Sequence, residues 1–342
     1  MIEPNLSLKP RAQDQAWQTL VAISKAPPQS LILIGPSGVG KRRSAKALFQ
    51  LLHCSSQGAE SVEDTLFGGP AEPATDAAPL SEPCGTCVSC RKIAQGKHAD
   101  LIEISPRGET IAVDDLREMK KMLFFAPLEG RFRFVIIDEA HRLNTSSANT
   151  LLKTLEEPPA HTRFILITHE RGLLLPTIVS RSQFVHFSPL DETTLKELLG
   201  ELHFEIPDRL MSVTLALLAG GLERAALLAD EKTIAFIETV QRSLASPPNR
   251  WEEIVALADQ LASTSGSPDG NNDWRLELLL DLLVLGGHRS ALASRNVNEA
   301  RHFANRALDA AYLRRRLERN ANKKLVALAA AELTASDTMG TR

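Results

Sequence analysis

The sequence contains no apolar run of the roughly 20 residues that a membrane-spanning helix needs. Its N-terminal stretch, MIEPNLSLKPRAQDQAWQTL, lacks the apolar core of a signal peptide. It also lacks a basic excess, because the formal net charge is -3, so no global positive field attracts nucleic acid. We therefore expect a cytoplasmic protein without membrane contact, in which any DNA contact comes from a local patch or from partner subunits.

Cysteine is scarce, with four residues in 342, and three of the four are clustered. Cys84, Cys87 and Cys90 follow Cys-x-x-Cys-x-x-Cys spacing, and Cys54 ends a predicted helix. In a reducing compartment such residues are thiols or metal ligands rather than disulfides. Four thiolates form a closed tetrahedral Zn²⁺ site that leaves no position open for catalysis. We predict one structural zinc ion in a module spanning 54–90; free buried thiols or an iron–sulfur cluster are the alternatives.

Large apolar side chains are also rare between residues 55 and 83. This stretch is rich in Ala, Pro, Glu, Ser and Gly. Such a composition cannot bury enough surface to order the chain, so we predict a disordered loop.

Strands and helices alternate in the N-terminal half of the chain. Short apolar runs predict strands, and apolar residues at helical spacing predict the helices between them. The strands are expected at 31–34, 101–104, 132–137 and 164–168, and the helices at 12–25, 41–53, 113–123 and 145–155. This order predicts an α/β domain with a parallel sheet over residues 1–188.

Strand signals vanish from Pro189 onward. Helices are expected at 191–202, 208–219, 222–243, 251–263, 274–285 and 299–333, with linkers at 246–250 and 264–273. We predict a small helical domain over 189–243 and an all-helical C-terminal domain over 244–342.

A phosphate-binding loop motif follows the first predicted strand. Residues 35–41 read Gly-Pro-Ser-Gly-Val-Gly-Lys and fit G-x-x-x-x-G-K between a strand and a helix. Gly35, Gly38 and Gly40 let backbone N–H groups point inward, and Lys41 would reach the β- and γ-phosphates of a nucleotide. A Gly-rich turn without a nucleotide is the alternative.

The residue after Lys41 breaks this motif. A Ser or Thr hydroxyl should stand there and coordinate Mg²⁺, but the residue is Arg42, which offers no lone pair and would repel the ion. Ser44 lies most of a helical turn further on. We expect weak or absent ATP binding at this site, without efficient hydrolysis.

Two carboxylates, Asp138 and Glu139, end the predicted strand 132–137. In P-loop ATPases this Asp helps to hold Mg²⁺ and the Glu can polarise the attacking water. A solvated acidic pair at a strand end is the alternative. Together with the Gly-rich loop, the pair indicates an inherited nucleotide site.

Further motifs appear in a recognisable order. After Lys41 and the cysteines come Val135–Asn144, the stretch Asn-Thr-Leu-Leu-Lys-Thr-Leu-Glu-Glu-Pro-Pro at 149–159, and Ser-Arg-Ser at 180–182. The sequence resembles the bacterial clamp-loader AAA+ subunits of DNA polymerase III, strongly over roughly residues 10–240 and more loosely beyond. The resemblance implies a P-loop AAA+ domain, a helical lid and a C-terminal collar.

The resemblance also implies partners. The family's subunits form a hetero-pentamer with gamma/tau and delta subunits, which uses ATP to place a sliding clamp on primed DNA. The gamma/tau branch hydrolyses ATP, whereas the delta-prime branch usually has a degraded site. Arg42 and the short length favour the delta-prime branch; a gamma/tau-type ATPase is the alternative, and a zinc-stabilised DNA-binding module is a third, which the acidic net charge disfavours.

Residue roles follow from the same resemblance. Arg181 would act in trans on the ATP of a neighbouring subunit. Thr168 resembles the sensor that contacts the γ-phosphate, and Arg224, near Gly221, resembles the second sensor of the lid. The alternatives are a surface arginine, a strand-end hydroxyl and a solvated helix arginine.

Overall fold

The computed structural model describes residues 8–55, 81–106, 108, 110–169, 171–245, 274–318 and 322–335. Most of the predicted loop 55–83, the predicted helix 251–263 and the linkers 246–250 and 264–273 lie outside these residues. The chain divides into two compact units, Met1–Thr194 with Gly220–Leu222, and Leu195–Ala219 with Glu223–Arg342. The division into three domains predicted from the sequence stays a prediction.

A five-stranded parallel sheet forms the centre of the first unit, with strand order β2-β3-β4-β1-β5. The strands are β1 (Ser30–Ile34), β2 (Leu101–Ile104), β3 (Arg133–Ile137), β4 (Thr162–Thr168) and β5 (Gln183–His186). β1, β3 and β4 are almost entirely buried, as expected for apolar strands covered on both faces. The predicted α/β class with a parallel sheet is confirmed.

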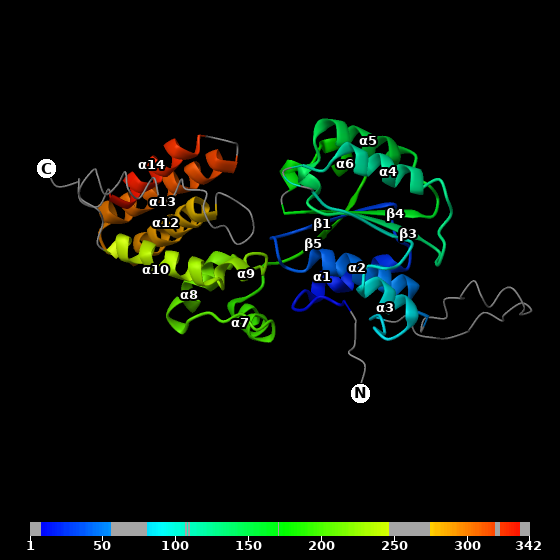
Figure 1. Ribbon diagram of the computed structural model, residues 1–342, viewed down its shortest axis with the longest axis horizontal. Helices are drawn as coiled ribbons and strands as arrows, with labels where there is room; N and C mark the ends of the chain where they lie inside the picture. Colours follow the sequence, from blue (N-terminus) through cyan, green and yellow to red (C-terminus); the bar gives the residue numbers. More distant parts are fainter. Residues whose placement is uncertain are drawn as a thin grey trace, which may run out of the picture. The chain divides into compact units, whose positions relative to one another are not determined.

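Helices cover both faces of this sheet (Figure 1). One face carries α1 (Asp14–Ser24), α2 (Lys41–His53) and α3 (Val88–Ala94), and the other carries α4 (Val113–Met122), α5 (Thr145–Glu156) and α6 (Pro176–Val179). Leu116 and Met119 of α4, which lie three residues apart on one face of the helix, are buried in the core. Asn144 caps α5, because its side chain accepts a hydrogen bond from the Ser147 N–H at 2.9 Å.

The edge strand β5 was not among the predicted strands. Of its four residues only Val185 is buried, because β5 lies at the edge of the sheet and has a neighbouring strand on one side only. The continuous apolar run that identifies the inner strands is therefore missing from its sequence.

The second unit contains helices joined by turns and loops, and no strand among its described residues. Its helices are α8 (Asp208–Leu218), α9 (Ala225–Leu228), α10 (Glu231–Ala245), α12 (Trp274–Ala293), α13 (Val297–Glu318) and α14 (Lys323–Ala335), while α7 (Glu192–Glu201) begins where the first unit ends. Asp191 accepts a hydrogen bond from the Thr194 N–H at 2.7 Å and so caps α7. None of the described helices combines the length and apolar character needed to cross a membrane.

Two of the predicted long helices are wrong, because polar caps interrupt them. The predicted helix 222–243 is split into α9 and α10, where the Asp230 carboxylate accepts from the N–H groups of Lys232 and Thr233. The predicted helix 299–333 is split into α13 and α14, where Asn322 accepts from the N–H groups that begin α14.

The predicted helix 274–285 is too short, since α12 continues through Gly286 and Gly287 to Ala293. A Cβ atom at Gly287 would lie 2.8 Å from the Phe303 carbonyl oxygen. This glycine therefore lets α12 and α13 approach closely instead of ending the helix.

Candidate nucleotide site and metal centre

The phosphate-loop motif lies between β1 and α2, as predicted. Gly38 and Gly40 have φ values of 76° and 95°, which only glycine adopts easily, and Gly40 is the N-cap of α2. Lys41 is buried, and its Nζ donates to the carbonyl oxygens of Gly35 and Pro36 at 2.6 and 2.5 Å. The loop therefore has the curled backbone and the lysine position of an anion-binding helix N-terminus.

A short segment, Gly220–Leu222, packs directly on this loop. The Leu222 N–H donates to the Gly38 carbonyl oxygen at 3.1 Å. A Cβ atom at Gly221 would lie 1.8 Å from the Ser37 carbonyl oxygen, so no other residue fits there without a shift of the backbone. Gly221, which the sequence pairs with Arg224, therefore lies against the phosphate loop.

The two acidic residues stand at the end of β3. Asp138 Oδ1 accepts from the Glu139 N–H at 3.0 Å. Glu139 has a left-handed φ of 46°, an uncommon conformation for a non-glycine residue, and pairs with Arg142 at 2.6 Å. Both acids therefore lie at the edge of the sheet where the strands end, and each has a basic partner.

Arg42 is the partner of Asp138. Its Nη1 lies 3.7 Å from Asp138 Oδ2, while its Nε and Nη2 donate to Glu103 Oε2 at 3.0 and 2.7 Å. Lys46 Nζ contacts the other Glu103 oxygen at 2.7 Å. Burial alone would raise the pKa of Glu103, but the hydrogen bonds from Lys46 and Arg42 lower it. A guanidinium thus bridges carboxylates from β2 and from the end of β3.

Mg²⁺ does not fit this arrangement. The ion requires oxygen ligands at about 2.0–2.1 Å in near-octahedral geometry. The position expected to supply a hydroxyl instead supplies a cation beside Asp138, which would repel the ion. The Ser44 hydroxyl is fully buried and donates to the Gly40 carbonyl oxygen at 2.8 Å.

Thr168 ends β4 directly beside Ile34, the last residue of β1. Its hydroxyl lies 3.4 Å from Nδ1 of His141, whose ring packs against His169 with a centroid separation of 4.2 Å. Burial, and then the neighbouring His169, lower the pKa of His141 to about 4. His141 is therefore neutral at physiological pH and adds no positive charge there; the sensor role of Thr168 stays a prediction.

Arg181 lies near the amino ends of the strands, whereas the phosphate loop lies at their carboxyl ends. It precedes β5, whose first residue Gln183 pairs with Leu31 near the start of β1, whereas the phosphate loop follows the end of β1. Four strand steps span about 13 Å, so Arg181 lies well away from the loop of its own chain. Its guanidinium is exposed and pairs with Glu156 at 3.1 Å.

Arg224 lies in an ion-pair cluster of the helical unit. Its guanidinium contacts Asp281 at 2.5 Å and Glu277 at 3.2 Å, and Arg314 contacts the same two carboxylates. Burial would lower the pKa of Arg224, but the two carboxylates outweigh it and raise the pKa. The second-sensor role of Arg224 stays a prediction.

The four cysteines come together as predicted for a metal centre. Their ligand atoms all lie within 4.8 Å of one another, and the Sγ atoms of Cys84 and Cys90 are 4.0 Å apart. Four sulfurs at about 2.3 Å from a central Zn²⁺ would be about 3.8 Å apart, so the cluster fits the ion. The 4.0 Å separation excludes a disulfide between Cys84 and Cys90, which would need about 2.05 Å.

The thiols of this cluster differ in proton affinity. Burial alone would raise the pKa of Cys84, but hydrogen bonds from Cys87 and Thr86 lower it to about 5. Burial raises the pKa of Cys90. Cys54 and Cys90 are fully buried, whereas Cys84 and Cys87 are partly exposed, so a metal held here would lie near the surface on the side of Cys84 and Cys87.

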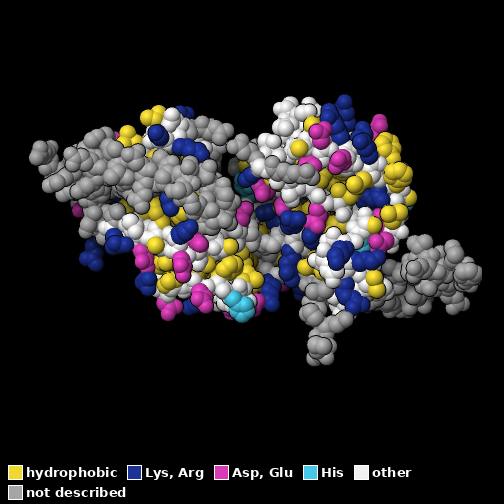
Figure 2. Space-filling view, viewed as in Figure 1, with side chains coloured by type: hydrophobic (Ala, Val, Ile, Leu, Met, Phe, Trp, Pro, Cys, Tyr) yellow, Lys and Arg dark blue, Asp and Glu magenta, His cyan; other side chains and the backbone are white. Residues whose placement is uncertain are grey.

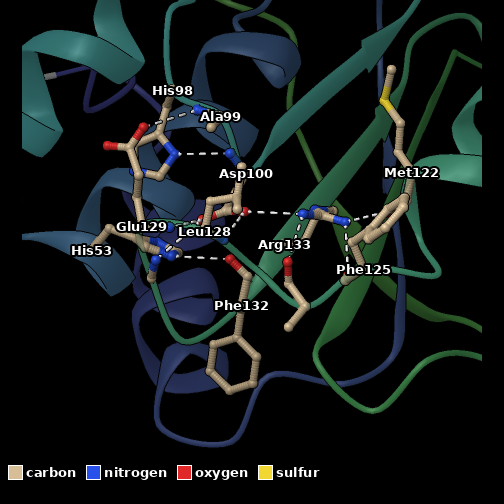
Figure 3. A network of polar contacts seen from close by, with 12 residues as sticks. His53, His98, Ala99, Asp100, Met122, Phe125, Leu128, Glu129, Phe132 and Arg133 are labelled. Carbon is tan, nitrogen blue, oxygen red and sulfur yellow. Dashed lines mark hydrogen bonds and ion pairs between the residues drawn. The ribbon is translucent and has the colours of Figure 1, made fainter. Parts of the chain in front are cut away.

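A buried polar network supports the chain segment between α4 and β3 (Figure 3). The fully buried Asp100 accepts hydrogen bonds from the N–H groups of Leu128, Glu129 and Gly130 and pairs with Arg133 at 3.3 Å. Arg133 in turn donates to the carbonyl oxygens of Met122, Phe125 and Ala126. The two residues of this ion pair therefore fix both halves of the segment, because Arg133 binds the first half and Asp100 binds the second.

This segment exposes large apolar side chains, a feature that the sequence analysis missed. Met122, Phe124, Phe125 and Leu128 are each more than half exposed. Figure 2 shows hydrophobic side chains gathered along the outer edge of the α/β unit, where α4 leads into β3. The available signal was the run Met-Leu-Phe-Phe-Ala-Pro-Leu at 122–128, which is too apolar for an ordinary loop.

The fold is an α/β domain with a parallel sheet and a phosphate-loop motif, together with a helical C-terminal part. A family model described as "DNA polymerase III, delta subunit" matches residues 71–191. DNA polymerase III subunit tau of Salmonella typhimurium is 36% identical over 201 residues, which cover 58% of this chain and 28% of tau. Subunit gamma/tau of Mycobacterium bovis is 36% identical over 170 residues, which cover 49% of this chain and 26% of the relative.

Among solved structures, a DNA polymerase III gamma subunit-related protein from Thermotoga maritima aligns over 94% of this chain and 99% of its own, with 18% identity and a TM-score of 0.47. The chain spans little more than a quarter of the length of the tau and gamma/tau relatives. The chain is therefore similar in sequence to delta-type, tau and gamma/tau subunits of DNA polymerase III over part of its length.

Proposed function

We propose that this chain is the delta-prime subunit of a bacterial DNA polymerase III clamp loader. In this role it joins gamma/tau and delta subunits in a hetero-pentamer that loads the sliding clamp onto primed DNA. The observation that carries the choice of delta-prime is Arg42, which stands beside Asp138 where an ATPase of this family needs a magnesium ligand. The similarity to tau and gamma/tau supports the wider assignment.

The chain contributes to catalysis through Arg181 rather than through its own loop. Arg181 is remote from Lys41 along the sheet, so any phosphate that it contacts belongs to another subunit. Its pairing with Glu156 is exposed, and surface pairs of this kind contribute only about 0–1 kcal/mol. The guanidinium therefore leaves Glu156 at little cost when a neighbour's γ-phosphate is near.

Exposed apolar surfaces support an assembly of several chains. The segment 122–128 is held in one shape by buried bonds while it exposes Phe124 and Phe125. In the helical unit, Leu308 and Tyr312 of α13 are also exposed, as expected if these helices form a collar. Contiguous exposed apolar groups of this kind typically mark protein contacts.

A gamma/tau-type ATPase is the second candidate, because Lys41, Asp138 and Glu139 are all present. Activity of the isolated chain separates the two functions. We expect the purified chain to show no Mg-ATP turnover, and to restore clamp loading on primed DNA when it is added to gamma/tau and delta. Steady Mg-ATP turnover by the chain alone would favour the second candidate, and failure to enter the complex would contradict both.

The cysteine cluster is proposed to hold one structural Zn²⁺. Its closed set of four sulfurs would join the end of α2 to the start of α3. We expect elemental analysis to find one zinc per chain, and Cys87→Ser to lose the metal and to lower the melting temperature. The matched change Val88→Ser, at a mostly exposed neighbour, should keep both. Unmodified protein without zinc would contradict this prediction.

A further inference from the structure

Arg42 has partners that fix its guanidinium at the phosphate loop. It is the second residue of α2, directly after Lys41. Two of its nitrogens donate to one oxygen of Glu103, and the third lies 3.7 Å from Asp138. The carboxylates are each about one-fifth exposed, whereas the Arg42 side chain is 48% exposed. The guanidinium is therefore anchored from inside the domain and open to solvent on its other side.

Arg42 and Lys46 carry two positive charges, and the carboxylates of Glu103 and Asp138 match them in number. Glu103 is shared with Lys46, which contacts its other oxygen at 2.7 Å. Asp138 is only at the limit of an ion pair with Arg42. Lys41 and the N-terminal end of the α2 dipole add positive charge beside this balanced cluster.

The rest of the loop retains what an anion requires. The backbone is curled at Gly38 and Gly40, and Lys41 stands at the first position of the helix. These parts bind phosphate through N–H groups and a lysine and do not themselves require a metal ion. A divalent ion does not fit here, because the Arg42 guanidinium lies beside Asp138, the carboxylate that would help to bind the ion.

We propose that this loop binds the polyphosphate of a nucleoside di- or triphosphate in its metal-free form, with the Arg42 guanidinium in place of Mg²⁺. This inference builds on the proposed function, in which the chain's own site does not hydrolyse ATP. Arg42 contributes one fixed positive charge and hydrogen-bond donors that match phosphate oxygens. A nucleotide that carries its own Mg²⁺ is disfavoured, because the ion and the guanidinium repel each other.

Nucleotide titrations of the isolated full chain test this inference. Fluorescent ADP and ATP analogues are titrated at constant ionic strength, once with EDTA and once with excess Mg²⁺. We expect binding in EDTA that is at least as tight as in Mg²⁺, competition by inorganic tripolyphosphate, and loss of binding in Lys41→Ala. Arg42→Thr restores the hydroxyl, so its binding should become about tenfold tighter with Mg²⁺ than with EDTA.

Two further variants isolate the role of position 42. Arg42→Lys keeps the charge and should keep the metal independence. Arg43→Thr removes the same charge at the next residue and should also leave the metal independence unchanged.

Three results would overturn the proposal: no nucleotide bound in either buffer, binding that requires Mg²⁺ in the unmodified chain, or an Arg42→Thr chain that stays indifferent to Mg²⁺. None of these three results would change the outcome expected in the clamp-loading assay, so the proposed function would still stand. Conversely, a chain that binds metal-free nucleotide but does not enter the loader would contradict only the proposed function.

Discussion

Asp100→Ala is expected to lower the free energy of unfolding by about 3–5 kcal/mol, the range for removing one partner of a buried ion pair. Asp100 is fully buried, and the Arg133 side chain is 6% exposed. Without the carboxylate, the Arg133 charge remains buried and three backbone N–H groups lose their acceptor. The loss should exceed that of any exposed acidic residue in this unit.

Denaturant unfolding measures this loss, and amide hydrogen exchange locates it. Exchange at Leu128, Glu129 and Gly130 should become much faster in Asp100→Ala, because these amides bond to the missing carboxylate. Glu118→Ala, at an exposed position of α4 in the same unit, should change stability by less than about 0.5 kcal/mol. Equal effects of the two variants would show that the network is not a main source of stability.

Arg181→Ala is expected to slow ATP turnover at the neighbouring site by about 10³-fold, the lower end of the range measured for arginine fingers in GTPases. The guanidinium would neutralise charge that develops on the γ-phosphate in the transition state. Arg181→Lys should recover only part of the rate, since an ammonium lacks the planar fork of donors. The loss of turnover is easiest to measure in a loader in which only the subunit next to Arg181 can hydrolyse ATP, because no other site then contributes to the rate.

Arg209→Ala is the matched control for Arg181→Ala. Arg209 is also exposed and also pairs with a glutamate, Glu238. Its removal takes away the same charge from the surface without touching the proposed interface, so turnover should stay close to that of the unmodified loader. A comparable loss in both variants would indicate a general charge effect.

Features that depend on local sequence were predicted well. The inner strands are continuous apolar runs because helices cover both faces of the sheet, so their residues alone indicate them. The phosphate loop and the clustered cysteines depend on short spacings, and the structure places each set together. The same holds for the start of α5 at Thr145, which was predicted and which Asn144 fixes through a partner three residues away.

Features that depend on distant partners were not predicted. The sequence shows that Arg42 replaces a hydroxyl, but its partner Glu103 lies on β2 and becomes a neighbour only through the sheet order. Asp100 and Arg133 likewise meet across β2 and β3. The breaks at Asp230 and Asn322 were missed because one capping side chain outweighs a favourable helical pattern.

The most direct test of the central claim compares Lys41→Ala with Arg181→Ala in one assay, steady-state ATP hydrolysis by the reconstituted loader with clamp and primed DNA. If the chain acts on a neighbour's nucleotide, Arg181→Ala cripples turnover and Lys41→Ala hardly changes it, because the chain's own loop does not hydrolyse ATP. If Lys41→Ala is the damaging change and Arg181→Ala is silent, the chain is an ATPase in its own right and the proposed role is wrong.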